Sequence, residues 1–256
     1  MRGIVNPSTL ACLPQTGWGA GVENHRMLTV DVADARVSGL CVVVLHGYAM
    51  KPEDLMPFAR SMGVPGRYCF PRGPFDAELG GFAWWPVDEA ARGAALAHGP
   101  RDLSQEHPAQ REKARTALAS LLQEASSQGA GRLVLAGFSQ GGMLACDTLL
   151  HEDVHVDALA LFSSSRIALD EWQARRHRLA GLPALVAHGK ADVDLAFAAG
   201  RALHDWLVEA GAAARWAPFE GGHEMPLAVW RGFRRFLREI SAPSTPFWGP
   251  PAAPCK

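Results

Sequence analysis

The sequence lacks any block of charge of one sign. Its 25 lysine and arginine residues nearly balance 26 aspartate and glutamate residues, so the formal net charge at pH 7 is −1. Binding to a nucleic acid or to an anionic membrane surface usually relies on a basic stretch. Because the sequence has none, neither partner is predicted. A group of arginines near the C-terminus recurs at helical spacing and is interpreted as the solvated face of a helix. These arginines are Arg231, Arg234, Arg235 and Arg238.

Long hydrophobic runs are also missing. No apolar segment approaches the roughly 20 residues that a membrane-spanning helix needs. At the N-terminus, Arg2 is not followed by a continuous apolar region, because Pro7 and Pro14 interrupt it. We therefore expect neither a signal peptide nor an integral membrane protein.

Cysteine is sparse and scattered. The five cysteines are odd in number, and no two of them have the spacing of metal ligands. This usage favours a reducing compartment, so a cytoplasmic protein without a metal site is predicted. The cysteines are Cys12, Cys41, Cys69, Cys146 and Cys255.

Length and composition indicate one globular unit. The chain has 256 residues, of which 48% are hydrophobic and 20% charged, and this is enough for one sizeable core. We expect a single domain over residues 1–240, with an irregular lead-in to about residue 25. Residues 75–108 have no clear period and are interpreted as a lid or substrate-pocket segment. Residues 241–256 contain five prolines and are expected to be extended or disordered.

Strand and helix patterns alternate from residue 40 onward. Such alternation is typical of an α/β fold, in which helices cover both faces of a mostly parallel central sheet. The expected strands are 27–32, 40–45, 67–70, 133–136, 158–162, 184–187 and 215–219, and the expected helices are 52–62, 110–128, 143–150, 196–210 and 226–240.

One segment carries a chemical motif. The apolar run from Leu133 to Ala136 leads into Gly137-Phe138-Ser139-Gln140-Gly141, and a helical pattern follows. Strand, Gly-x-Ser-x-Gly and helix in this order are typical of the nucleophile elbow of α/β-hydrolases. The tight turn would hold the Ser139 hydroxyl at a helix N-terminus, above the carboxyl end of the sheet.

A serine needs a base, and the base needs an acid, in the chain order serine, acid, histidine. Asp192 follows the strand 184–187 and is the favoured acid. Asp194 is the alternative, although we expect it to cap the next helix. Asp157 precedes its strand and therefore lies at the wrong end of the sheet.

His223 is the candidate base. It follows Gly221-Gly222 in the loop between the last strand and the last helix, and the two glycines permit a close approach to the elbow. His204 falls within a predicted helix. His46 and His188 also stand at strand ends, but their turns are better explained by backbone roles.

Two further groups complete the candidate site. An oxyanion hole needs two N–H donors, and we assign them to Gln140, which follows the nucleophile, and to Tyr48, which follows an early strand. Trp84 and Trp85 either pack in the core or line an apolar acyl-binding groove, and the sequence does not separate these two interpretations.

Four motifs together resemble the carboxylesterase/phospholipase family, which includes acyl-protein thioesterases. They are His46-Gly47-Tyr48, Gly137 to Gly142, His188 to Asp192, and Gly221 to Glu224. The resemblance covers about residues 40–240 and implies an α/β-hydrolase fold without a cofactor. It implies Ser139, Asp192 and His223 as the triad, and small acyl esters or thioesters as substrates.

Departures from the family pattern keep other functions open. The segment 75–108 is similar to bacterial members rather than to eukaryotic thioesterases, so ester hydrolysis is favoured over protein deacylation. A peptidase or a C–C hydrolase would use the same triad. A hydrolase-like protein that binds a ligand without catalysis is the non-enzymatic alternative, and an intact triad argues against it. A homodimer is left open.

Overall fold

The computed structural model describes residues 27–32, 39–127 and 130–242. The expectations for the lead-in and for the tail from residue 243 lie outside the described residues. Seven strands form one sheet in the order β1-β3-β2-β6-β7-β8-β9. Only β1 is antiparallel to its neighbour. The strands are β1 (Leu28–Val32), β2 (Leu40–Leu45), β3 (Gly66–Phe70), β6 (Arg132–Phe138), β7 (Ala158–Phe162), β8 (Pro183–Gly189) and β9 (Ala213–Phe219).

The central strands are buried on both faces. All six residues of β2 are buried, and alternate side chains contribute to opposite cores because strand side chains alternate in direction. Val42 and Val44 belong to one core cluster, and Val43 and Leu45 belong to the other. Such continuous apolar strands are expected only in a parallel sheet that helices cover on both sides.

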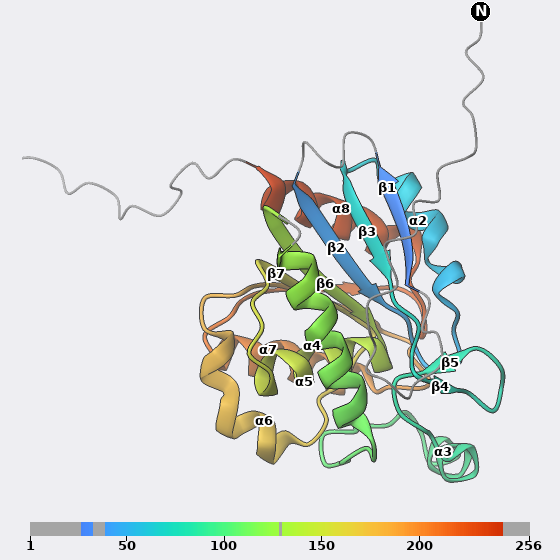
Figure 1. The fold of residues 1–256 in the computed structure, drawn as a ribbon. Helices are drawn as coiled ribbons and strands as arrows, with labels where there is room; N and C mark the ends of the chain where they lie inside the picture. Colours follow the sequence, from blue (N-terminus) through green and yellow to red (C-terminus); the bar gives the residue numbers. More distant parts are fainter. Residues whose placement is uncertain (1–26, 33–38, 128–129, 243–256) are drawn as a thin grey trace, which may run out of the picture.

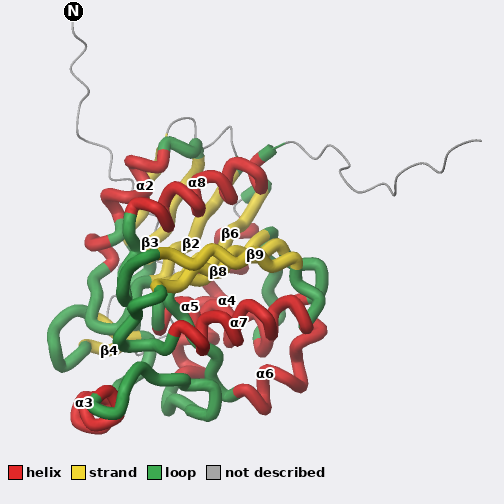
Figure 2. Tube along the Cα trace, turned by 180° about the vertical axis from the view of Figure 1, so that it is seen from behind, coloured by secondary structure: helices red, strands yellow, loops and turns green. Residues whose placement is uncertain are grey.

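Helices provide that cover (Figure 1, Figure 2). Figure 2 shows α2 and α8 together on one side of the sheet, and α4, α5 and α7 on the other. The two core clusters divide in the same way. The helices of the two layers are α2 (Met56–Met62), α4 (Arg111–Ser127), α5 (Gln140–His151), α6 (Leu169–Arg175), α7 (Phe197–Glu209) and α8 (Leu227–Ser241).

Some local predictions need correction. The helix expected over 52–62 begins as a short 3-10 turn, Pro52–Asp54, before α2. The segment 75–108 does contain regular structure. It contains the two-stranded hairpin β4 (Phe75–Asp76) and β5 (Phe82–Ala83), and then the exposed helix α3 (Glu89–Leu96). The helix α6 and the 3-10 turn Arg176–Leu179 that follows it were not predicted from the sequence.

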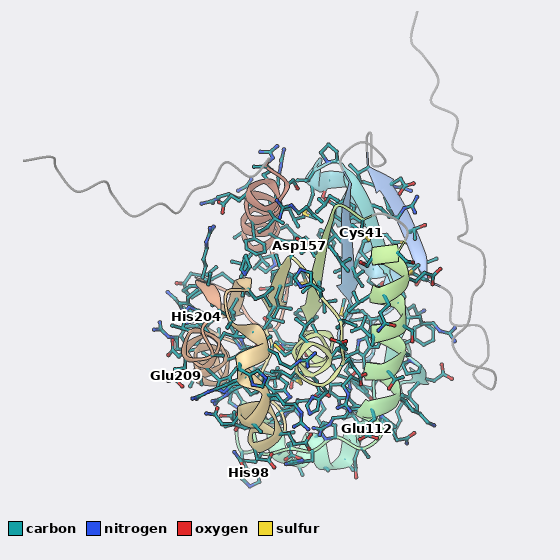
Figure 3. The ribbon with its side chains drawn as sticks, turned by 60° about the vertical axis from the view of Figure 1, so that its left-hand side comes forward. Cys41, His98, Glu112, Asp157, His204 and Glu209 are labelled. Carbon is teal, nitrogen blue, oxygen red and sulfur yellow. The ribbon has the colours of Figure 1, made fainter. Side chains whose placement is uncertain are left out.

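The direction of the strands determines where a site can form. Figure 3 shows Asp157 beside the strands and His98, which closely follows α3, at the lower edge of the molecule. Asp157 lies at the amino ends, where its carboxylate accepts a hydrogen bond from the N–H of Leu133. This agrees with the exclusion of Asp157 as the acid. No helix within the described ranges is both long and apolar enough to cross a bilayer.

Candidate active site

The predicted elbow is a sharp turn between β6 and α5. Ser139 has a φ of 51° and a ψ of −118°, a region that non-glycine residues rarely occupy and that costs about 1–3 kcal/mol. The flanking glycines permit this turn. A Cβ on Gly137 would lie 2.4 Å from the Gly141 backbone, and a Cβ on Gly141 would lie 2.5 Å from the His46 carbonyl oxygen. Side chains at either position would therefore force the turn open.

Ser139, His223 and Asp192 form a continuous hydrogen-bonded row. Ser139 Oγ lies 2.9 Å from His223 Nε2, and His223 Nδ1 lies 2.8 Å from Asp192 Oδ2. Both distances are within the range expected for a nucleophile, its base and the group that orients the base. Ser139 and Asp192 are buried, whereas the His223 side chain is 18% exposed. The structure thus brings together the three side chains that were predicted from the sequence.

The loops that follow β8 and β9 are held at this position by hydrogen bonds between their backbones. The Lys190 N–H donates to the Phe219 carbonyl, and the Ala191 N–H donates to that of Gly221. Gly189 is needed at the crossing, since a Cβ there would lie 2.2 Å from the Gly222 carbonyl oxygen. This pairing fixes the loop of Asp192 against the loop of His223.

The Asp192 carboxylate is held from both sides. Its Oδ1 accepts the N–H groups of Asp194 and Leu195, each at 2.9 Å. Burial disfavours the charge of Asp192, but hydrogen bonds from His188 and His223 outweigh burial and hold the pKa of this carboxyl well below its ordinary value. Asp192 is therefore an anion at neutral pH, as a group that stabilises an imidazolium must be.

Asp194 has a different role from the helix cap that we predicted. The N-cap residue of α7 is Ala196, and no side chain caps that helix. Asp194 instead forms ion pairs with Arg92 of α3 and with Arg101. Its backbone carbonyl also accepts the Arg101 N–H at 2.9 Å. Asp194 thus ties the segment containing α3 to the loop of Asp192.

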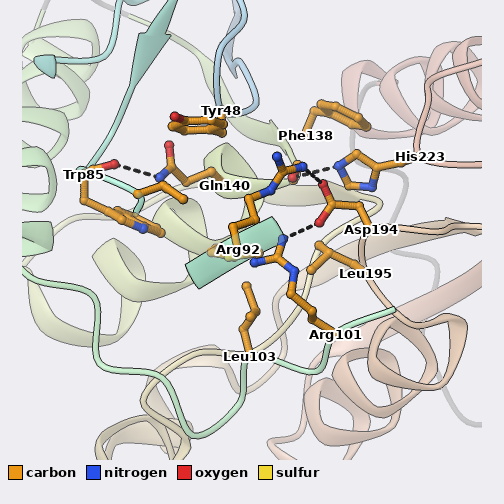
Figure 4. A pocket seen from close by; sticks show the side chains of 13 residues that line it. Tyr48, Trp85, Arg92, Arg101, Leu103, Phe138, Gln140, Asp194, Leu195 and His223 are labelled. Atoms are coloured by element: carbon orange, nitrogen blue, oxygen red, sulfur yellow. Dashed lines mark hydrogen bonds and ion pairs between the residues drawn. The ribbon is translucent and has the colours of Figure 1, made fainter. Parts of the chain in front are cut away.

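A pocket opens beside the Ser139 hydroxyl (Figure 4). It has a volume of about 160 Å³. Figure 4 shows the Arg92 and Arg101 side chains converging on Asp194 in this pocket. Tyr48 and Gln140, the expected oxyanion donors, both line it. The other lining residues are mostly apolar, namely Trp85, Val87, Leu103, Phe138, Met143 and Leu195.

The two adjacent tryptophans have different surroundings. Trp85 lines the pocket. Trp84 is fully buried outside the lining, stacks on His46 with ring centroids 4.8 Å apart, and donates its indole N–H to the His46 carbonyl. The Gln140 side chain holds both backbones, because it accepts the Trp84 N–H at 2.8 Å and donates to the Trp85 carbonyl at 3.0 Å. Sequence reasoning missed this function of the Gln140 amide.

His46 is another residue that the sequence did not reveal. Its side chain is buried, contrary to the purely backbone role that we expected. Nε2 accepts the N–H of Gly73 at 2.9 Å, and Nδ1 donates to the Gly47 carbonyl at 2.7 Å. A neutral imidazole satisfies both partners, and it fixes the loop that presents Tyr48. Burial lowers the pKa of His46 to about 4.

This lowered pKa predicts acid destabilisation. Between about pH 6.5 and pH 4 the unfolded chain binds a proton at His46 that the folded protein excludes, so its contribution to stability is complete above pH 6.5 and is lost as the pH falls toward 4. The loss is about 3 kcal/mol over this window. Urea unfolding at pH 7 and pH 4.5 measures it. His46→Gln keeps an acceptor for Gly73 but does not titrate, so its unfolding free energy should depend less steeply on pH. Identical pH dependence in both proteins contradicts the prediction.

The described residues contain no cluster of three or more side chains suited to hold a metal ion.

The comparisons with known proteins agree with the geometry. Residues 32–241 match the family model described as Phospholipase/Carboxylesterase.

Solved structures show the same fold. Esterase PE8 is 25% identical, with a TM-score of 0.67 over 84% of this chain and 98% of that chain. Acyl-protein thioesterase 2 of Zea mays is 18% identical, with a TM-score of 0.69 over 86% of this chain and 100% of that chain. The Bacillus cereus carboxylesterase is 17% identical, with a TM-score of 0.64 over 84% and 94%. The predicted fold class and resemblance are confirmed: the chain belongs to the phospholipase/carboxylesterase family of α/β-hydrolases.

Proposed function

We propose that this protein is a serine hydrolase that cleaves short-chain carboxylic esters through an acyl-enzyme, and that it acts in the cytoplasm. One observation carries the proposal: the hydrogen-bonded row from Ser139 through His223 to Asp192 stands at the wall of a small pocket. A row of this kind raises the nucleophilicity of a serine that would otherwise be unreactive. The cytoplasmic assignment is supported by the free thiols of Cys41, Cys69 and Cys146.

The proposed reaction uses only groups of the protein and water. His223 Nε2 takes the proton of Ser139 as Oγ attacks the acyl carbonyl, and Asp192 stabilises the resulting imidazolium. The oxyanion is received by the N–H groups of Tyr48 and Gln140. Gln140 is the first residue of α5, so its N–H has no partner within the helix and is free to donate. His223 then protonates the leaving alcohol, and water activated by His223 releases the acid.

The size of the pocket favours a short acyl group. Its volume of about 160 Å³ is close to that of a cavity that holds one benzene molecule, about 150 Å³. An acyl chain of a few carbons fits in such a space, whereas a fatty acyl chain would extend beyond it. Arg92, Arg101 and Asp194 also line the pocket, and their charges disfavour a long apolar chain at that point.

A fluorophosphonate probe and a series of p-nitrophenyl esters, from acetate to palmitate, test the proposal. We expect covalent labelling of the peptide that contains Ser139, together with hydrolysis that is fastest for short chains. Thioesters of the same acids measure the preference for the leaving group. A protein that is neither labelled nor active on any ester of the series refutes the proposed function.

The pocket wall gives a second testable prediction. Trp85→Leu replaces the indole of the lining by a smaller aliphatic side chain, so the chain length with the highest kcat/KM should increase by about two or more carbons. Trp84→Phe is the matched control, because Trp84 is the buried neighbour outside the lining. This control should change all esters by the same factor. A Trp85→Leu profile parallel to that of the wild type would assign Trp85 to packing alone.

A further inference from the structure

His188 is a fully buried histidine that the proposed reaction does not use. It lies near the end of β8, four residues before Asp192, and its side chain is 0% exposed. Its Nε2 lies 3.2 Å from Asp192 Oδ2 and 3.0 Å from the Leu195 carbonyl oxygen. Both neighbours are acceptors, so Nε2 must carry the hydrogen. Sequence reasoning assigned only a backbone role to this residue, and the contacts of its side chain correct that assignment.

The other ring nitrogen determines the charge of His188. Nδ1 is buried and has no hydrogen-bond partner among the described residues. A proton there would leave a buried N–H unpaired, which is costly. His188 is therefore a neutral imidazole in the Nε2–H tautomer, and it contributes a dipole without adding a charge next to the proposed triad.

Two imidazoles thus meet at one carboxylate oxygen. Asp192 Oδ2 accepts from His223 Nδ1 at 2.8 Å. His188 Nε2 lies 3.2 Å from the same oxygen, so its single hydrogen is shared between Asp192 Oδ2 and the Leu195 carbonyl oxygen. The backbone of Asp194 and Leu195 occupies Oδ1. A carboxylate bound only through Oδ1 could still turn about that oxygen, and a hydrogen bond from His188 to Oδ2 opposes this rotation. The direction from which Asp192 meets His223 is consequently determined in part by His188.

The position of the His188 ring is itself determined by α7. Gly200 leaves the space that the ring fills, since a Cβ at residue 200 would lie 2.1 Å from His188 Nδ1. The Phe197 ring meets the imidazole edge to face, with centroids 6.3 Å apart. Helix packing thus holds the ring in contact with Asp192, and the ring has no room to swing away on that side.

We propose that His188 is a positioning residue, which holds the Asp192 carboxylate in the orientation that aligns His223 with Ser139. The proposal rests on the proposed function, but its structural part, the dependence of the Asp192–His223 hydrogen bond on His188, is observable without any substrate.

Three variants and one control test it. His188→Leu retains an apolar side chain and removes the donor, His188→Gln can place an amide N–H near the position of Nε2, and His188→Asn has an amide too short to reach Asp192. His204→Gln is the control, because it removes an imidazole of α7 that contacts Asp205 and does not line the pocket. For the wild type and each variant, kcat and KM are measured with p-nitrophenyl acetate, and the low-field proton NMR signal of the His223 Nδ1–H is recorded.

We expect His188→Leu and His188→Asn to lower kcat by about 10- to 100-fold, as for the loss of one hydrogen bond to a charged group. KM should stay within about twofold, and the low-field signal should broaden or disappear. His188→Gln should recover most of the activity, and His204→Gln should resemble the wild type. Should His188→Leu fail to fold, the contrast between Gln and Asn decides the question.

Equal kcat in the Gln and Asn variants, or an unchanged low-field signal in a folded variant that lacks the donor, overturns the positioning role. Failure of the proposed function has a different signature. In that case the wild type hydrolyses no ester and is not labelled by fluorophosphonate, while the NMR comparison still determines whether His188 holds Asp192 against His223.

Discussion

Ser139→Ala is expected to lower the kcat of ester hydrolysis by about four to six orders of magnitude, while the fold is retained. The substitution removes only Oγ, the atom that lies 2.9 Å from His223 Nε2. The oxyanion donors and the pocket are left in place, so KM should change little and a small residual rate over water should persist. Steady-state kinetics and circular dichroism of both proteins measure the effect.

Fluorophosphonate labelling supplies the control for this result. The probe should modify the wild type and leave Ser139→Ala unmodified. A buried serine nearby, Ser164, donates its hydroxyl to the Ser139 carbonyl and so has no base of its own. Ser164→Ala should therefore retain labelling and activity. A folded Ser139→Ala protein with most of the wild-type activity would show that another group is the nucleophile.

Asp192→Asn is expected to lower kcat by about four orders of magnitude, as the same change of the triad acid does in a serine protease. If the amide oxygen keeps the two backbone N–H donors at Oδ1, the amide NH₂ faces His223 Nδ1. His223 must then present a lone pair at Nδ1 and carry its hydrogen on Nε2. In this tautomer it cannot accept the proton of Ser139.

Asp194→Asn is the matched control for that substitution. Its side chain pairs with Arg92 and Arg101 and forms no hydrogen bond or ion pair with His223 or Ser139. Its backbone N–H, which donates to Asp192, is unaffected by the substitution. We expect kcat within about tenfold of the wild type and a loss of about 1–3 kcal/mol in unfolding free energy. Kinetics and thermal melts of both variants measure the difference. The reverse pattern would make Asp194 the catalytic acid.

The sheet and the three candidate triad positions could be predicted because their signals are local. A buried parallel strand is a continuous apolar run, as in Leu40–Leu45, and it ends where a glycine-rich turn begins. The elbow glycines are required by close backbone approaches at Gly137 and Gly141, so they are visible as a motif. Because the strands are parallel, the segments of Ser139, Asp192 and His223 then lie together at the carboxyl ends of the strands.

What the sequence did not reveal depends on contacts between distant residues or on exposed structure. The helix α3 has no buried residue, so no stripe of large core-facing side chains marks it, although Asp88 caps it. Asp194 resembled a helix cap because its partners, Arg92 and Arg101, are 102 and 93 residues away. His188 and His46 looked like turn residues because a buried imidazole is identified by its surroundings, which no local pattern specifies.

The separation of the three site segments along the chain has a consequence for how the protein acquires activity. The hydrogen bond between Ser139 and His223 joins residues 84 apart, and β9, which precedes His223, is at the edge of the sheet. Contacts of such long sequence separation form late, because a large loop must first be closed. An enzyme assembled in this way gains turnover only when its last strand has docked. The rate at which hydrolysis returns after dilution from denaturant therefore reports the docking of β9 onto the sheet. A nascent chain released before β9 would be inert even with its serine elbow already formed.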